Sequence, residues 1–280
     1  MYERLRLQKE WHALRKLITS QRSRTSKLSA AAILASFYPF YHWITDLENE
    51  CDDAATLSTK GVLDKTAIGR LQEQGYCIVP NALQNKELTQ AVQAARRFEL
   101  ATTAAWVRRD EIGWVDENNQ GQLKTARTLV RGVGAELDTA PEYKRSTRHR
   151  VPTECQLGRY ESGGFYGVHR DNRNDATLWE QGLVPYLVRT PERRRCCTAI
   201  LYLTHDDTER PWSSSEDGGE LVLYLGTEGE GSSKEGATAT VRVEPRGGTL
   251  LVFDSSLLHE VRQTRRPKRN ALTSWVQGAR

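Results

Sequence analysis

The stretch that most constrains this chain runs from Tyr160 to Asp171, YESGGFYGVHRD, because it ends in a His-x-Asp pair. We interpret this stretch as a β-strand. Residues two apart on a strand project from the same face, so His169 and Asp171 are expected to point the same way. An imidazole and a carboxylate on one face can bind one metal ion. The fold must then bring a further ligand to this face from elsewhere in the chain.

His259 is the candidate third ligand. It follows an apolar strand predicted at residues 249–253, within GGTLLVFDSSLLHEV, and a second strand could carry it across to the pair. Two imidazoles and one carboxylate on one side of an octahedral ion are the ligand set of non-haem Fe(II) oxygenases, and they leave positions open for substrate. The three residues therefore predict an iron site.

A second His-x-Asp pair competes with this interpretation. His205 and Asp207 have the same spacing, but they begin a polar turn and lack the Gly-Gly-aromatic sequence that precedes His169. Because a His-x-Asp pair alone is a weak signal, this context favours His169 and Asp171.

The segment RNALTSWV begins ten residues after His259 and provides a second kind of site. Read as a strand, it places Arg269, Ala271, Thr273 and Trp275 on one face, with the guanidinium at the metal end of the sheet. Arginine can bind a carboxylate through two parallel hydrogen bonds. The pattern predicts a dicarboxylate cosubstrate that chelates the metal at one end and binds Arg269 at the other, with Thr273 along the same pocket.

Hydrophobic periodicity predicts the elements around these residues. Helices are expected near residues 64–74, 85–98 and 123–137, and further strands near 76–79, 107–115, 196–204 and from 218 onward. Trp114, in the strand at 107–115, is predicted to be a core residue.

The region from Gly75 to Trp275 resembles the Fe(II)/2-oxoglutarate-dependent dioxygenases. Within them it is similar to the prolyl 4-hydroxylase-like branch and to the oxygen-sensing type of prolyl hydroxylase. The landmarks that carry the resemblance occur in family order: VRRDEIGWVDE (107–117), YESGGFYGVHRD (160–171), CCTAILYLT (196–204), GGEL (218–221) and HEV…RNALTSW (259–275).

This resemblance implies a mainly β fold with flanking helices (α+β), namely a double-stranded β-helix of the jelly-roll or cupin type preceded by a helical extension. It implies Fe(II), with 2-oxoglutarate and O2 as cosubstrates and ascorbate as a reductant. It also implies individual roles, carried over by position: iron ligation by His169, Asp171 and His259, binding of the far carboxylate of 2-oxoglutarate by Arg269 and Tyr202, and contact near its other end by Tyr160. Collagen-type enzymes usually carry Lys where Arg269 stands, so the Arg favours the sensor-like and bacterial-like branch.

Three functions are compatible with these residues. The first is hydroxylation of a prolyl residue in a peptide or protein, with release of succinate and CO2, which the match at Val107 to Glu117 favours. The second is hydroxylation of a free amino acid or another small metabolite by the same iron site. The third is a non-catalytic β-barrel binding protein, which retention of the whole ligand set disfavours.

The chain is expected to divide into an extension at residues 1–62 and a catalytic domain at residues 63–280. Residues 1–28 are basic with apolar residues at helical spacing, residues 29–44 form an apolar run, and residues 46–65 have the composition of a linker. A packed helical extension is the first interpretation of residues 1–44; an organelle-targeting peptide and a weak signal anchor are the alternatives. Membrane association is not expected.

Composition limits partners and compartment. The net charge of +4 is too small to indicate nucleic-acid binding, and five cysteines without a CxxC motif predict reduced thiols in an intracellular, cytoplasmic setting. Between the metal pair and the next strand lies a long Arg-rich insert, residues 172–195. Because it leaves directly from the pair, it is a candidate specificity element, and a plain surface loop is the alternative.

Overall fold

The computed structural model describes residues 51–57, 61–105, 107–141, 143, 149–172, 194–204, 212–226 and 237–278. The predicted N-terminal helix and apolar run, residues 173–193 of the insert and the rival pair His205 and Asp207 lie outside these residues.

Thirteen strands and six short or medium helices make up the described part of the chain. The strands are β1 (Cys51–Asp53), β2 (Tyr76–Val79), β3 (Ala101–Ala105), β4 (Arg108–Val115), β5 (His149–Pro152), β6 (Cys155–Tyr160), β7 (Phe165–His169), β8 (Arg195–Tyr202), β9 (Leu221–Leu225), β10 (Ala239–Val243), β11 (Leu250–Asp254), β12 (Leu258–Val261) and β13 (Arg269–Gly278). The helices are η2 (Ala54–Thr56), α3 (Lys65–Gln74), α4 (Asn85–Arg97), η3 (Gly121–Leu123), α5 (Lys124–Thr139) and α9 (Ser214–Asp217). The helices and strands expected near the metal and cosubstrate residues are therefore present close to their predicted bounds.

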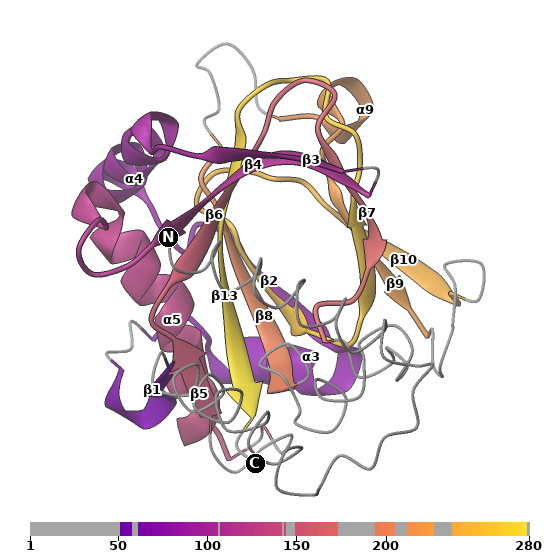
Figure 1. Cartoon of the computed structure of the whole chain (residues 1–280). Coiled ribbons are helices and arrows are strands. Elements are labelled where there is room, and N and C mark those ends of the chain that lie inside the picture. The colour runs from indigo at the N-terminus through magenta and orange to yellow at the C-terminus, as the bar shows by residue number, and fades with distance from the viewer. Residues whose placement is uncertain are drawn as a thin grey trace, which may run out of the picture. The chain divides into compact units, whose positions relative to one another are not determined.

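The strands form one antiparallel sheet that curls round on itself (Figure 1). The order along the sheet is β10-β9-β12-β7-β4-β6-β13-β8-β11-β2, with β1, β3 and β5 attached at its sides. Strand β4 pairs with β6 over one part of its length and with β7 over another, and so joins the two halves of the sheet. The mainly β class with flanking helices is confirmed.

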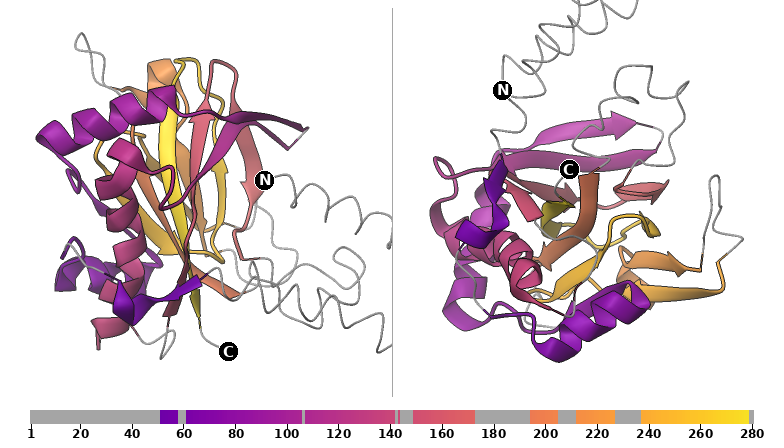
Figure 2. Two further views of the ribbon diagram at one scale, coloured as in Figure 1. Left: turned by 60° about the vertical axis from the view of Figure 1, so that its left-hand side comes forward. Right: turned by 90° about the horizontal axis from the view of Figure 1, so that it is seen from below.

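Helices α4 and α5 cover one outer side of the curled sheet, beside β6 and β13, and α3 lies near β2 (Figures 1 and 2). Along β13, Leu272 and Val276 pack toward these helices, while Ala271 packs inside the curl. Most residues of β8 and β11 are buried on both faces, so these two strands are mostly apolar rather than alternating. None of the helices described is long and apolar enough to cross a membrane.

The inside of the curl has its own apolar cluster, separate from the one beneath the helices. Its buried members come from β9 and β10 at one end of the sheet order and from β13, β8 and β11 towards the other end: Ile200, Tyr202, Leu221, Leu223, Val243, Leu251, Phe253 and Ala271. Because strand side chains alternate, every second residue of β8, β11 and β13 lines this interior. Polar groups that project inside from the same strands are therefore surrounded by apolar side chains.

Part of the segment expected to be a linker is folded onto the domain. Cys51–Asp53 pairs with β5 as strand β1, Ala54 is buried, and Asp52 forms an ion pair with Arg131 of α5. An acidic, Gly-poor segment lacks strand periodicity over three residues, so its pairing could not be read from composition. The division of the chain at residue 62 itself stays a prediction.

The packing of α5 can be tested with matched glycine substitutions. A Cβ on Gly134 would lie 2.5 Å from Val151 Cγ2 of β5, whereas a Cβ on Gly69 in α3 would meet nothing within 4 Å. We expect Gly134→Ala to lower the free energy of unfolding by about 1–3 kcal/mol through overpacking. Gly69→Ala should raise it by about 0.4–1 kcal/mol, because alanine restricts the unfolded chain. Urea unfolding of both variants measures this; equal effects would contradict the close packing of α5 on β5.

Candidate metal centre and cosubstrate pocket

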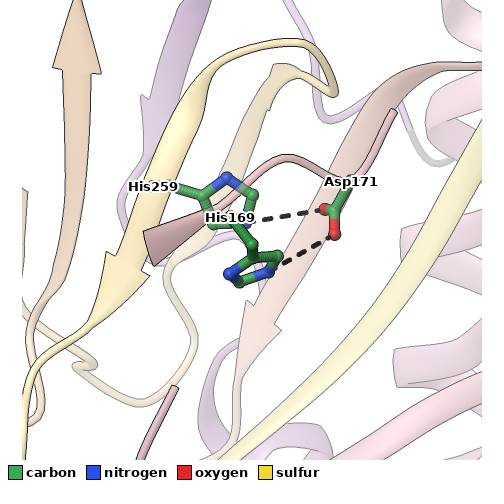
Figure 3. A group of neighbouring side chains, drawn as sticks. All are labelled: His169, Asp171 and His259. Carbon is green, nitrogen blue, oxygen red and sulfur yellow. Dashed lines mark ion pairs between the residues drawn. The ribbon is translucent and has the colours of Figure 1, made fainter. Parts of the chain in front are cut away.

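Three side chains from distant parts of the chain meet at one end of the curled sheet. Strands β7 and β12 are antiparallel with His169 directly opposite His259, and the centroids of the two rings are 4.2 Å apart. Asp171 lies across from both: its Oδ1 is 3.7 Å from His169 Nε2 and its Oδ2 is 3.8 Å from His259 Nε2 (Figure 3). The three ligand atoms lie within 4.8 Å of one another, which suits a single metal ion.

The route by which these residues meet differs from the sequence interpretation. Strand β7 ends at His169, and Asp171 lies two residues beyond it rather than on the same strand face. His259 is the second residue of its own strand, β12, which follows β11 after a turn. The His-x-Asp spacing therefore identified two residues that lie close together. The prediction that both project from the same face of one strand was wrong, because one lies at the end of the strand and the other beyond it.

Both imidazoles are oriented by backbone carbonyls. His169 Nδ1 lies 2.8 Å from Gly167 O, and His259 Nδ1 lies 2.9 Å from Leu257 O. A carbonyl oxygen only accepts, so each Nδ1 carries the proton and each Nε2 carries a lone pair. Both lone pairs are on the nitrogens nearest Asp171. This is the arrangement in which an outer hydrogen bond fixes the tautomer of a metal-binding histidine.

Electrostatics keep the cluster in its ligating state. The pKa of His169 is lowered to about 3, mainly because the ring is buried and secondly because His259 lies beside it. The charge of Asp171 acts in the opposite direction and raises this pKa. Burial alone would raise the pKa of Asp171, but His259 and His169 hold it below its ordinary value. Near neutral pH this leaves a neutral imidazole at His169 beside an ionised carboxylate.

A pair of buried hydroxyls lies behind the carboxylate. Thr198 Oγ1, on β8, donates to Asp171 Oδ2 at 2.8 Å, and Ser255 Oγ lies 2.8 Å from Thr198 Oγ1. Since the single proton of Thr198 is directed to the carboxylate, the Ser255 hydroxyl donates to Thr198. Arg195 adds a 3.5 Å hydrogen bond to the main-chain oxygen of Asp171. These contacts restrict rotation of the Asp171 side chain.

Arg269 lies inside the sheet with only 1% of its surface exposed. Its Nε donates to Gly219 O at 2.6 Å, and its guanidinium carbon lies 4.8 Å from the centroid of the Tyr160 ring and 5.3 Å from that of Tyr202. Among the described residues no carboxylate lies within salt-bridge distance of it. The Tyr202 hydroxyl is also buried and has no hydrogen-bond partner there. Among the described residues, therefore, the buried cation lacks an anionic partner and the buried phenol lacks a hydrogen-bond acceptor.

The GGEL sequence explains how Arg269 fits. Gly219 has a φ of +71°, and a Cβ there would lie 3.2 Å from Arg269 Cδ and 3.1 Å from Thr264. Only glycine gives this backbone conformation and close approach without strain. The Gly-Gly pair before β9 thus lets a main-chain carbonyl bind the guanidinium.

The other predicted cosubstrate residues lie at different distances from Arg269. Tyr160 is its register partner on β6 and is buried; burial raises the pKa of the Tyr160 phenol, followed by the effect of Asp110. Burial raises the pKa of Tyr202 to about 12, with Arg269 opposing. Thr273 is half-buried four residues further along β13, paired with Ile200 of β8. The structure therefore gathers Tyr160 and Tyr202 around Arg269, and a cosubstrate contact by Thr273 stays a prediction.

Sequence reasoning missed two groups beside the metal residues. The Tyr166 ring is stacked on His169 at 3.7 Å, and the Arg108 guanidinium lies 4.4 Å above Tyr166. Thr198 was read only as part of an apolar strand. Strand alternation could have identified Thr198, because it lies four residues before the inward Tyr202 and therefore on the same face of the strand.

An aromatic group lies near the same end of the sheet. Trp275 lies 4.1 Å from the Arg195 guanidinium carbon and 6.3 Å from Trp114, centroid to centroid. Trp114 is 37% exposed, so the expectation of a core residue was wrong. One side of its ring lies against Trp275, and part of the ring stays accessible.

Residues 155–277 match the family model described as the 2OG-Fe(II) oxygenase superfamily. No curated protein matches the sequence. Among solved structures, a Pseudomonas putida prolyl-4-hydroxylase is 24% identical with a TM-score of 0.52, over 77% of this chain and 98% of the other. A Trichoplax adhaerens prolyl hydroxylase, in complex with a hypoxia inducible factor peptide fragment, is 22% identical with a TM-score of 0.55, over 75% and 87%. The non-haem α-ketoglutarate-dependent epimerase SnoN of nogalamycin biosynthesis is 14% identical with a TM-score of 0.53, over 77% and 82%.

The likeness to these structures shows the fold, a double-stranded β-helix. The two-histidine, one-carboxylate set is the ligand set that non-haem Fe(II) oxygenases use. The family model of the 2OG-Fe(II) oxygenase superfamily matches residues 155–277 of this chain, and members of that superfamily use Fe(II), 2-oxoglutarate and O2. The donor set fits Fe(II), because both imidazoles present bare nitrogens toward an ionised carboxylate.

The hydroxyl pair behind Asp171 makes a prediction about metal affinity. Outer hydrogen bonds to a metal ligand typically contribute about 10–100-fold in affinity. We therefore expect Thr198→Val, which keeps the shape but removes the donor, to weaken Mn(II) binding by about that factor, while Thr198→Ser retains it. Anaerobic calorimetry on the metal-free protein measures the affinity, and circular dichroism checks the fold. Equal affinity in the valine and serine variants would contradict the role.

Proposed function

We propose that this protein is an Fe(II)- and 2-oxoglutarate-dependent dioxygenase that hydroxylates a C–H bond. In this proposal His169, Asp171 and His259 are the iron ligands, and Arg269 binds the far carboxylate of 2-oxoglutarate. The observation that carries it is a buried guanidinium with no carboxylate partner in the described structure, inside the same curled sheet as a three-residue metal-ligand set.

When bound, Fe(II), 2-oxoglutarate and O2 supply the oxidising chemistry, with succinate and CO2 as the cosubstrate's products. The chain's own residues bind and orient. Arg269 offers a planar pair of donors to a carboxylate, and the Tyr202 phenol, protonated at neutral pH because of its raised pKa, offers a further donor. Tyr160 borders the same pocket. The surrounding apolar side chains exclude water and strengthen these interactions.

For the substrate, we propose a prolyl residue in a peptide or protein. The segment from Val107 to Trp114 resembles the edge that covers bound peptide in sensor-type prolyl hydroxylases. The fold is shared with a prolyl hydroxylase in complex with a peptide fragment. Three apolar side chains are exposed in this region: Val107 just before β4, Trp114 on β4 and Val168 on β7. They offer contact surface to a peptide.

A small-molecule substrate is the second candidate, and one observation favours it. The fold is shared equally with an epimerase of nogalamycin biosynthesis, with a TM-score of 0.53 against 0.52 and 0.55 for the two prolyl hydroxylases. The same iron and 2-oxoglutarate residues would serve such a reaction. A non-catalytic binding protein would lack cosubstrate turnover altogether.

We also propose a cytoplasmic location for the protein. All five cysteines are free rather than paired in disulfides, as expected in a reducing compartment. Fractionation of cells that express the full chain tests this location.

The iron ligands are tested by removing them one at a time. We expect His169→Ala or Asp171→Ala to abolish 2-oxoglutarate turnover and to remove the visible charge-transfer band that forms on anaerobic addition of Fe(II) and 2-oxoglutarate. His149→Ala is the control, since this buried histidine pairs with Asp138 and shares no contact with the three residues. Full turnover in either ligand variant would refute the assignment.

The cosubstrate pocket is tested separately from the metal. A hydrogen bond to a charged group contributes about 1.5–3 kcal/mol, so Tyr202→Phe should raise the KM for 2-oxoglutarate by about 10–100-fold with a smaller effect on kcat. Arg269→Gln should raise it further, while metal binding in both variants remains. Steady-state succinate assays with Fe(II) and ascorbate measure these values, and an unchanged KM in both would exclude this pocket.

The substrate is tested by mass spectrometry. The enzyme is incubated with Fe(II), ascorbate and 2-oxoglutarate together with proline-containing peptides, candidate proteins or free proline. We expect a gain of one oxygen on a prolyl residue of a peptide or protein. A gain confined to free amino acids or other small molecules would favour the second candidate, and neither gain nor succinate would favour the third.

A further inference from the structure

A second polar cavity lies on the helical side of the domain and shares no residue with the candidate metal centre. Its volume is about 350 Å³, and it lies between α5, the residues that lead into α5, and the end of η2. Figure 1 shows α5 beside β1, the strand that leads into η2. Gln120 precedes the helix, and four of the residues that line the cavity lie on α5 at positions i, i+3, i+4 and i+7 and so share one helix face: Lys124, Arg127, Thr128 and Arg131.

The charges around this cavity do not balance locally. Arg131 forms an ion pair with Asp52 and donates to Pro152 O, so its charge is matched. Lys124 is exposed and has no ion pair among the described residues, and the first turn of α5 contains no acidic residue. Of the two carboxylates that precede the helix, Asp116 accepts hydrogen bonds from the main-chain N–H groups of Asn118 and Asn119, and Glu117 is 75% exposed and only reaches 4.0 Å from Arg127.

Arg127 is the unusual member of this group. It is 4% exposed, yet its hydrogen bonds go to neutral acceptors, Thr153 O at 2.6 Å and Gln120 Oε1 at 3.3 Å. Its Nε is buried without any partner. Burial, followed by repulsion from Arg131, lowers the pKa of Arg127. A buried cation of this kind is costly unless an anion lies near it, and a buried donor without a partner is a typical sign of an absent ion.

We propose that this cavity binds a small oxyanion, the phosphate or carboxylate group of a metabolite. The ammonium of Lys124 would contact the anion from the exposed side, and the Thr128 hydroxyl would donate to it. The buried guanidinium of Arg127 provides the positive field behind it, because charge in a desolvated wall is poorly screened. The proposal does not depend on the proposed oxygenase activity, since none of its residues belongs to that site.

The test is calorimetric titration of the full chain with inorganic phosphate and, as a separate arm, with succinate. All titrations use an Arg269→Gln background, so that the candidate cosubstrate pocket does not contribute. We expect saturable binding of at least one anion, weakened by about tenfold in Lys124→Ala, which is the loss of one charge-assisted hydrogen bond. Lys65→Ala is the matched control, because Lys65 is also an exposed first residue of a helix but lines no part of this cavity.

Phosphate-selective binding would assign a phosphorylated ligand, and succinate-selective binding would assign a carboxylate ligand. The absence of saturable binding, or binding that Lys124→Ala and Lys124→Glu leave unchanged, would overturn the proposal. Arg127→Gln should abolish binding; if that variant fails to fold, as the lost bond to Thr153 O could cause, the Lys124 variants still decide the outcome.

Discussion

The candidate site depends on the antiparallel pairing of β7 with β12. That pairing sets His169 opposite His259, and the side chains of directly opposite residues in an antiparallel pair project from the same face. A shift of one residue would send one imidazole outside the curl. The register is held from the other side as well, because β12 also pairs with β9 and places His259 beside Leu223. The metal centre is thus built on strand register rather than on loops.

Two kinds of contact then turn this register into a chemically defined site. Carbonyl acceptors at Gly167 and Leu257 select the tautomer of each histidine, and the hydroxyl of Thr198 restrains the carboxylate. The two carbonyls lie two residues before their histidines, and Thr198 contacts Asp171 from β8, which is not adjacent to β7 in the sheet order. The site is therefore pre-organised before any metal binds, which reduces the ordering that binding would require.

The sequence was sufficient for the ligand set, Arg269 and most elements, because these depend on residue type and short-range periodicity. It could not show that Asp171 lies beyond β7, since the end of a strand is decided by where pairing stops. It could not assign Thr198, because a single hydroxyl in an apolar strand is no signal without knowledge of what faces it. Trp114 was misjudged for a related reason: aromatic residues are usually buried, but burial depends on neighbouring strands that local pattern does not reveal. Strand β1 was missed because its pairing partner is about a hundred residues away.

The buried arginines of this domain divide into two groups, and the division carries the functional argument. The buried Arg131 is matched by Asp52, and the half-buried Arg108 by Asp110, so their charges are neutralised within the fold. Arg269 is bound by a carbonyl and two aromatic rings, and Arg127 by a carbonyl and an amide. Carbonyls, amides and rings stabilise a guanidinium but do not cancel its charge, and removal from water is costly for each ion. The domain contains two such arginines, Arg269 inside the curled sheet and Arg127 on α5. At each position, binding an anion would lower the free energy of the native state.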